Sequence, residues 1–443
     1  MDNYTKVMEQ KAYEAAIEYY PKEKILEAVN TFHKFSDSLD DFLRDHGYAG
    51  DINDITGKTD FIKRSFEKSE IPVPRGIREW YTKGKGISRT TAFQICFAFR
   101  LDKVETDDFF RRVMMTKSFD CHAMEEAVYY YCIYNGKDYA EADKLLQASP
   151  LNQIPDITKS RMVFDGDILF TSSIMKEIDQ FKSGEELLTY FKKNVEKFGY
   201  NHVTATDGIQ KLWREIRNKE KGLADKEKIR IQGCIIKTEE ERSVSEILRQ
   251  IMGLDEVEVV EKRVENKENL EKDNKSLFVL KSDRSIKPLL KNNPLLPEIA
   301  QKQFPNRQTL KKILNGEHVE PESIRKTMIL TYFYYFWIKK ALQEEGKEQT
   351  ENNSNSTPMI KLLNMMAYQA APGDDGRFID NMNSRLLEVG YPELYPGNPY
   401  DWIFVYCSMS EEPLTVFREF IHEMYLENES DIIKLNEKQN SKS

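Results

Sequence analysis

The sequence predicts a mainly α-helical protein, with two helical units joined by a mostly helical middle region. Aromatic residues are dense, with 22 Tyr, 24 Phe and 4 Trp, and they recur at helical spacing. The most apolar stretches, residues 125–134 and 325–342, exceed ordinary strand length, so we expect both to form buried helices. Strand-like alternation occurs only at residues 228–237 and 276–281, which leaves a small two-stranded β element open.

Helix-start signals place further helices in the middle of the chain. Ser183 and Glu186 have the spacing of a capping box, in which each side chain satisfies a free backbone N–H of the other residue. Ser243 and Glu246 repeat this spacing. The apolar periodicity predicts helices near residues 172–181, 184–198 and 206–221.

Shifts in composition divide the chain into three segments. They are an N-terminal helical unit, a middle region and a C-terminal helical unit, over residues 1–149, 150–285 and 286–427. The middle region includes a charged connector at residues 256–275. The insert 344–357 and the tail 428–443 are polar and poor in apolar residues, so we expect both to be disordered.

The overall composition is that of a soluble globular protein. Of its 443 residues, 40% are hydrophobic and 31% are charged. No apolar run approaches the roughly 20 residues that span a bilayer, and no basic segment followed by an apolar one marks a signal peptide. The five cysteines are odd in number and form no CxxC pair, so we expect reduced thiols in a cytoplasmic protein without a membrane partner.

Positive charge is concentrated in two short regions. The net charge is −9, which argues against indiscriminate coating of DNA. Residues 58–89 carry nine Lys/Arg and four Asp/Glu, and residues 302–326 carry six and three, so these regions have charges of +5 and +3. Such islands in an acidic chain can bind phosphates locally, and the alternative is that they are solvated helix faces.

The two outer units share a pattern of helices and breaks. In each, a short helix, a turn and a second helix ending at a glycine precede a longer apolar helix. These expected helices cover residues 61–69, 75–84 and 88–102 in the first unit, and 296–303, 307–316 and 322–337 in the second. The terminating glycines are Gly84 and Gly316.

The similarity continues beyond these helices. Residues 109–136 match residues 385–410, with Glu126 opposite Asp401 and Cys132 opposite Cys407. We interpret the match as an internal duplication, the alternative being two unrelated bundles with generic patterning.

The repeated pattern resembles the Cro/C1-repressor (XRE) type of helix-turn-helix domain, in two divergent copies over roughly 37–148 and 290–427. The stretch "GYPELYPGNPYDWIFVYC" at 390–407 is similar to the segment that follows this domain in a variety from Gram-positive bacteria. The resemblance implies double-stranded DNA binding and regulation of transcription, often at mobile-element or phage-related loci. The turns depart from the family pattern because they carry Pro72, Pro74 and Pro305.

In this resemblance, the first turn of each second helix would enter the major groove. In the second copy Asn306, Arg307 and Gln308 would reach bases, because Arg can pair with guanine and Asn or Gln with adenine through two hydrogen bonds. The expected phosphate contacts there are Lys302, Lys311 and Lys312. In the first copy the expected contacts are Arg75, Arg78, Lys83, Lys85 and Arg89. This interpretation requires Arg307, Gln308, Lys311 and Lys312 to be exposed together on one helix face.

No motif in the sequence indicates an enzyme, a cofactor or a metal site. There is no P-loop, GxGxxG or GxSxG, and "HEMYL" at 422–426 lacks the second histidine of a zinc protease. Cys121 and His122 are adjacent, so on a helix their side chains would point apart. The alternative to DNA binding is a non-catalytic interaction or sensor protein of a phage-defence or mobile-element system. A protein partner or a homodimer is left open in either case.

Overall fold

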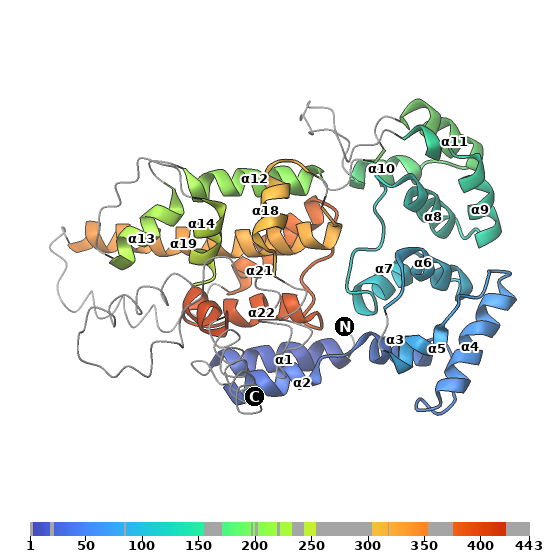
Figure 1. The fold of residues 1–443 in the computed structure, drawn as a ribbon, viewed down its shortest axis with the longest axis horizontal. Helices are drawn as coiled ribbons and strands as arrows, with labels where there is room; N and C mark the ends of the chain where they lie inside the picture. The colour runs from blue at the N-terminus through green and yellow to red at the C-terminus, as the bar shows by residue number, and fades with distance from the viewer. Residues whose placement is uncertain are drawn as a thin grey trace, which may run out of the picture.

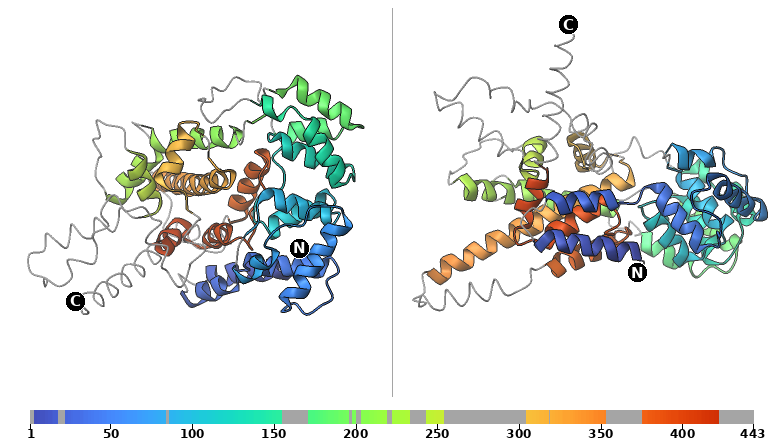
Figure 2. Two further views of the ribbon diagram at one scale, coloured as in Figure 1. Left: turned by 45° about the vertical axis from the view of Figure 1, so that its right-hand side comes forward. Right: turned by 90° about the horizontal axis from the view of Figure 1, so that it is seen from below.

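Two separate hydrophobic cores organise the chain. The computed structural model describes residues 3–17, 22–83, 86–154, 171–195, 198–199, 203–218, 222–232, 243–253, 304–317, 319–352 and 375–421. These residues form helices and contain no strand, which confirms the predicted mainly α class. Figure 1 shows the two lobes side by side, and Figure 2 shows the same division from two further directions.

The first lobe is built from helices that enclose a core rich in aromatic residues. They are α3 (Phe35–Asp45), α4 (Ile55–Lys68), α5 (Ile77–Thr82), α6 (Arg89–Ala98), α7 (Lys103–Arg112), α8 (Met124–Tyr134), α9 (Tyr139–Ala148), the 3-10 turn η1 (Leu151–Gln153), α10 (Thr171–Ile178) and α11 (Gly184–Lys193). The expected apolar helix at 125–134 is α8, and it is buried along nearly its whole length because its aromatic and aliphatic side chains point in all directions.

The second lobe combines both ends of the described chain. Its helices are α1 (Asn3–Ile17), α2 (Lys22–Thr31), α12 (Val203–Arg217), α13 (Leu223–Gln232), α14 (Val244–Ile251), α18 (Arg307–Leu314), α19 (Pro321–Asn352), α21 (Asp375–Glu388) and α22 (Pro399–Ser408), and residues 413–421 are also helical. The N-terminal hairpin α1–α2 packs against α22, where Trp402 Nε1 donates a hydrogen bond to the carbonyl of Met8 (3.1 Å). Phe32 contacts the edge of the Trp402 ring.

The expected segment boundary at 149/150 does not coincide with the division between these cores, and the boundary at 285/286 lies outside the described residues. Residues 3–17 and 22–32 belong to the second lobe, and residues 171–195 with 198–199 complete the first. The described remainder of the middle region, 203–253, packs into the second core, so the middle region divides between the two lobes. The physical reason is that isolated amphipathic helices must bury their apolar faces on whatever core is nearest in space.

Three local expectations are also corrected or limited. Residues 228–232 lie in α13, not in a strand, and 233–237 and 276–281 lie outside the described residues. The insert expected to be disordered from 344 is helical as far as Asn352, because α19 continues through it. The charged connector and the tail 428–443 lie outside the described residues.

Helix ends follow the expected local chemistry in most places. Ser243 and Glu246 form the predicted capping box at the start of α14. Ser183 caps α11, but Glu186 accepts the N–H of Lys182 (2.8 Å) instead of closing a box with Ser183. Gly316 ends α18 in the left-handed region with φ +70°, a conformation that carries no Cβ penalty in glycine.

Candidate nucleic-acid interface

Helix α18 is anchored by one face and by its C-terminal end. Its Leu310 and Ile313 are fully buried in the second core, where α18 packs against α12 and α14. The side-chain amide of Gln210 on α12 donates to the carbonyls of Ile313 (3.1 Å) and Leu314 (3.4 Å). These carbonyls lie in the last turn, where the regular helical acceptor pattern ends and Ile313 accepts the N–H of Gly316 (3.1 Å), so the amide of Gln210 supplies a further donor and fixes α18 relative to α12.

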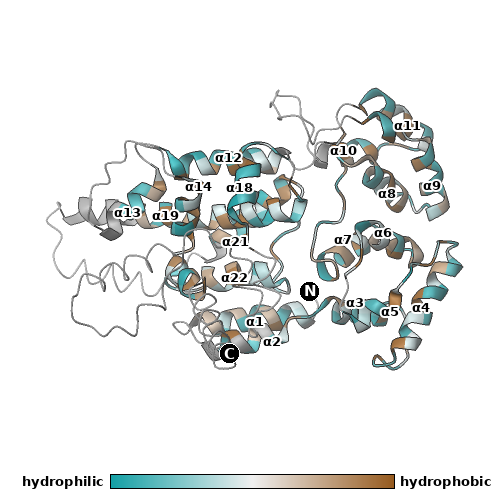
Figure 3. Cartoon of the chain, viewed as in Figure 1, coloured by the Kyte–Doolittle hydropathy of each residue, from teal (hydrophilic) through white to brown (hydrophobic). Residues whose placement is uncertain are grey.

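The opposite face of α18 carries the side chains that the DNA interpretation requires. Arg307, Gln308, Lys311 and Lys312 are all exposed, and successive helical residues are about 100° apart, so the four share one side of the helix. Within the residues that the structure describes, none of the four side chains has an ion-pair or hydrogen-bond partner. In Figure 3 the ribbons of α12 and α18 lie next to each other, and both carry many hydrophilic residues.

Asn306 has a structural role at this site. Its side-chain oxygen accepts the N–H of Thr309 (2.9 Å), so it is the N-cap of α18. An N-cap side chain satisfies one of the free N–H groups of the first turn. The expectation that Asn306 reads a base is therefore replaced by a capping role, and Arg307 and Gln308 remain as the exposed residues of the first turn.

The corresponding region of the first lobe presents a weaker cationic surface. Helix α5 is short, and its Ile77 and Trp80 are buried. Arg75 and Arg78 are exposed, whereas Lys83 pairs with Glu79 one turn earlier (2.9 Å). Residues 69–76 connect α4 to α5, which is longer than the tight turn of a typical helix-turn-helix.

The guanidinium of Arg89 binds partners within the first lobe, so it is not a free cation for a phosphate. Its Nε and Nη2 donate to the two carboxylate oxygens of Glu126 (2.7 Å each). Nη1 and Nη2 also donate to the carbonyls of Lys117 (2.9 Å) and Ser118 (2.7 Å). The expectation that Arg89 contacts DNA is therefore wrong, since four of the five N–H groups of its guanidinium donate within the first lobe. Lys85, Lys302, Gly84 and the helix expected at 296–303 lie outside the described residues.

The second lobe contains the same arrangement around Asp401. Arg325 on α19 donates to both carboxylate oxygens of Asp401, at 2.8 and 2.7 Å. Its Nη2 also approaches the carbonyls of Pro392 (3.5 Å) and Glu393 (3.3 Å). The carbonyl partners lie nine and eight residues before the carboxylate, as Lys117 and Ser118 do before Glu126. We call each arrangement of arginine, carboxylate and preceding loop a clamp.

Further backbone features coincide in the two clamps. The carboxylate accepts the N–H of the residue six positions earlier, Asp120 (2.6 Å) in the first lobe and Tyr395 (2.9 Å) in the second. The carbonyls of Asp120 and Tyr395 each accept an N–H from three residues later at 2.8 Å. The helices before the loops, α7 and α21, are each followed by a residue with positive φ, Met115 and Gly390. The match of 109–136 with 385–410 thus extends to specific hydrogen bonds.

The sequence pattern located the carboxylates but missed their arginines. Arg89 is five residues after Gly84, and Arg325 is nine after Gly316, so the two arginines lie one helical turn apart in the alignment. Residues four apart share a helix face, which explains how both guanidinium groups reach the same place. Burial differs, because Arg325 and Asp401 are 2% and 0% exposed, while Arg89 and Glu126 are 32% and 14% exposed.

Residues of the two clamp loops also contact the other lobe. The ammonium of Lys117 lies 5.4 Å from the ring centre of Tyr391, and Arg111 on α7 lies 5.6 Å from that of Tyr395. Lys117 is 4% exposed and lies 3.5 Å from a carboxylate oxygen of Asp120. The lobes therefore meet where the loops that their clamps hold in place come together.

Metal ligation and a reactive Cys121–His122 pair are the other kinds of site that the described residues can be compared with. No group of three His, Cys, Asp or Glu side chains there could hold a metal ion. Cys121 and His122 are both buried, and burial raises the pKa of the Cys121 thiol well above its usual value. In the described part of the chain, no helix has both the length and the apolar character needed to cross a bilayer.

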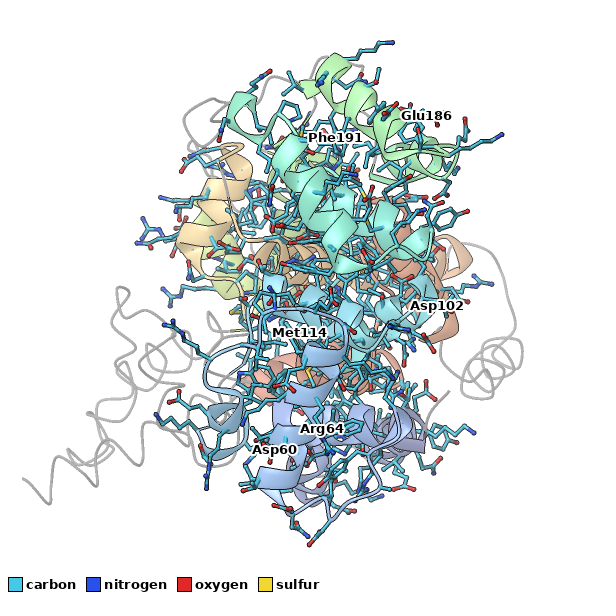
Figure 4. The ribbon with its side chains drawn as sticks, turned by 90° about the vertical axis from the view of Figure 1, so that its right-hand side faces the viewer. Asp60, Arg64, Asp102, Met114, Glu186 and Phe191 are labelled. Atoms are coloured by element: carbon cyan, nitrogen blue, oxygen red, sulfur yellow. The ribbon has the colours of Figure 1, made fainter. Side chains whose placement is uncertain are left out.

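The outer face of the first lobe carries charges of both signs. Figure 4 looks onto this face, with Asp60 and Arg64 along α4 and Glu186 on α11. Lys63 on α4 pairs with Asp60 (3.2 Å). Mixed charge of this kind does not attract a polyanion, so α18 presents the better candidate surface.

Comparison of the chain with protein-family models, with curated proteins and with solved structures gives no match.

Proposed function

We propose that this protein binds double-stranded DNA sequence-specifically through α18 and regulates transcription. The observation that carries the proposal is the exposed set of Arg307, Gln308, Lys311 and Lys312 on a helix whose other face is anchored in the second core. The resemblance of the repeat to repressor-type domains supports the same function and points to a mobile-element or phage-related locus.

The proposed mechanism divides the four side chains by their place on α18. Arg307 and Gln308 belong to the first turn, which reaches base edges when a helix enters the major groove with its N-terminus. Arg307 would pair with guanine and Gln308 with adenine, and each bidentate pair contributes about 1–3 kcal/mol of discrimination. Lys311 and Lys312 lie one turn later and would contact phosphates.

Selection of binding sites from random duplexes tests the base-reading step. The wild-type chain is expected to enrich a motif, and Arg307→Ala is expected to relax the preference at one position of that motif. Absence of any enriched motif at low salt would refute sequence-specific binding. A motif that Arg307→Ala leaves unchanged would remove α18 as the reader and direct attention to Arg75 and Arg78 in the first lobe.

The proposed phosphate contacts of Lys311 and Lys312 can be tested against a matched pair of lysines in the same chain. Lys311 and Lys312 form an exposed pair in the last turn of α18, and Lys192 and Lys193 form an exposed pair in the last turn of α11. Replacing either pair by alanine changes the net charge equally. We expect only the α18 double variant to make the dependence of log K on log salt shallower, by about 1.8 units for two phosphates. Equal effects of the two variants would indicate a non-specific charge effect.

A second candidate function, a non-catalytic interaction protein, is favoured by the first lobe. There Lys58, Lys83 and Arg89 are all ion-paired within the lobe, with Asp40, Glu79 and Glu126. A lobe that uses its cations for its own structure is suited to packing against other protein. This function predicts that the chain shows no salt-dependent affinity for duplex DNA, which the same titrations measure.

A further inference from the structure

We infer that Arg214 on α12 is a second phosphate-binding element beside α18, so that the DNA-contacting surface spans two helices that are distant in the sequence. The inference rests on the proposed function of α18 and adds a residue that neither basic region of the sequence contains. The two basic regions are residues 58–89 and 302–326, and Arg214 lies between them in the sequence, on α12.

The orientation of α12 follows from contacts on two of its sides. Ile209, Trp213 and Ile216 are buried in the second core. The side chain of Gln210 reaches the C-terminal carbonyls of α18. Gln210 therefore marks the flank of α12 that faces α18.

Arg214 lies on this same flank. It follows Gln210 by four residues, which places it about 40° around the helix and about 6 Å along the axis from Gln210. Its side chain is exposed, and within the described residues it has no ion-pair or hydrogen-bond partner. Figure 1 shows α18 next to α12, with both helices on the same side of the second lobe.

The nearby acidic residues do not neutralise this surface. Asp207 on α12 pairs with Lys211 one turn later. Glu215 lies on the other flank of α12 and accepts a hydrogen bond from Tyr335 of α19 (2.9 Å). Glu317, after the end of α18, accepts the side-chain amide of Asn315 (3.0 Å), and both Glu317 and Glu320 are exposed there. Arg214 with Arg307, Lys311 and Lys312 gives four positive charges against these two negative ones.

In this arrangement α12 would contact the phosphate backbone, whereas α18 would enter the groove. In a helix-turn-helix, one helix enters the groove while another crosses the phosphate backbone. Gln210 binds the C-terminal end of α18, so α12 lies at the end that is away from the base-reading first turn. Arg214 is thus placed toward the backbone beside the groove, where it would position the chain without reading sequence.

The experiment compares Arg214→Ala, Arg214→Lys and the control Arg64→Ala in the full chain. Arg64 is an exposed arginine on α4 of the first lobe. Binding is measured by titration with the selected duplex and with a scrambled duplex over a range of salt concentrations. We expect Arg214→Ala to lower affinity for both duplexes by the same factor and to make the salt slope shallower by about one unit. Arg214→Lys keeps the charge and is expected to retain the wild-type slope, and Arg64→Ala is expected to match the wild type.

Three outcomes would overturn the inference. If Arg214→Ala behaves as Arg64→Ala does while Lys311→Ala/Lys312→Ala weakens binding, Arg214 makes no contact and the function of α18 stands. If Arg214→Ala changes the selected motif, its contact is to a base and not to a phosphate. If the wild-type chain binds neither duplex at low salt, the proposed function fails and the inference fails with it.

Discussion

The clamp of the second lobe should be far more important for stability than the clamp of the first, although in both an arginine donates to two carboxylate oxygens. Asp401→Asn removes the negative charge and leaves Arg325 charged and buried. Burial opposes the charge of Arg325, but the carboxylate of Asp401 outweighs this effect and raises the pKa of the guanidinium. A guanidinium is intrinsically too basic to be deprotonated in proteins, so Arg325 keeps its charge when Asp401 is replaced. Breaking one partner of a fully buried pair costs about 3–5 kcal/mol.

Glu126→Gln is the matched variant in the first lobe. Arg89 is about one-third exposed, so water can solvate its charge when the carboxylate is lost. We expect this variant to cost about 1–2 kcal/mol, the range of a partly screened, charge-assisted hydrogen bond. The larger cost expected in the second lobe follows from its deeper burial, since in both lobes the arginine donates to two carboxylate oxygens and approaches two loop carbonyls.

Pulsed thiol labelling with peptide mass mapping measures the two lobes separately. Cys407 on α22 and Cys132 on α8 occupy equivalent positions, and both are fully buried. Asp401→Asn should increase labelling of Cys407 about 150- to 4,000-fold, since 1.4 kcal/mol corresponds to a factor of ten, and should leave Cys132 near its wild-type rate. Glu126→Gln should increase labelling of Cys132 by roughly 5- to 30-fold, from its smaller cost.

A double variant separates the lost ion pair from general disruption. In Arg325→Met/Asp401→Leu no buried charge remains, and apolar replacement of a buried pair is often close to neutral. We expect it to recover at least half of the stability lost in Asp401→Asn, although the N–H of Tyr395 loses its acceptor. The reasoning is refuted if Asp401→Asn accelerates labelling of Cys407 by less than tenfold, or if Cys132 accelerates equally.

Three further predictions follow from burial and backbone conformation. Burial raises the pKa of Cys132 to about 12, so at pH 8 roughly one thiol in 10⁴ is ionised, and Cys132 should resist a thiol reagent in the native protein and react after unfolding. Burial also raises the pKa of Tyr391 and of Tyr400 well above their ordinary value. A group whose pKa is higher in the folded state contributes to the free energy of unfolding below its unfolded pKa, and this contribution is lost as the pH rises above that value. Urea midpoints should therefore be constant from pH 6 to 8 and fall above about pH 9 to 10. A flat profile to about pH 11 would contradict this. Arg100 ends α6 with φ +55° on the surface, so Arg100→Gly should stabilise the first lobe by up to about 1 kcal/mol in urea unfolding, and a loss of stability would show that its side chain contributes contacts.

Local chemistry in the sequence was sufficient for much of the secondary structure. The capping box of Ser243 and Glu246 and the glycine stop at Gly316 depend on neighbours within six residues, so each could be recognised without the fold. The exposure of Lys311 and Lys312 opposite Leu310 and Ile313 follows from helical periodicity in the same way. The strand left open at 228–237 is replaced by helix over its described part, 228–232, because α13 packs against α12 and α19, and tertiary packing overrides a short alternating pattern.

The helical class, the pattern shared by the two outer parts and the exposed cationic helix face could all be predicted from the amino-acid sequence. These features are periodic or local, and the printed residues carry them directly. The tertiary structure was needed to show that α1 and α2 join the second lobe, that Arg89 and Arg325 belong to clamps, and that Gln210 of α12 binds the C-terminal end of α18. Each of these depends on contacts between residues far apart in the chain, such as Trp402 with Met8 or Gln210 with Ile313, and no spacing within one segment records them.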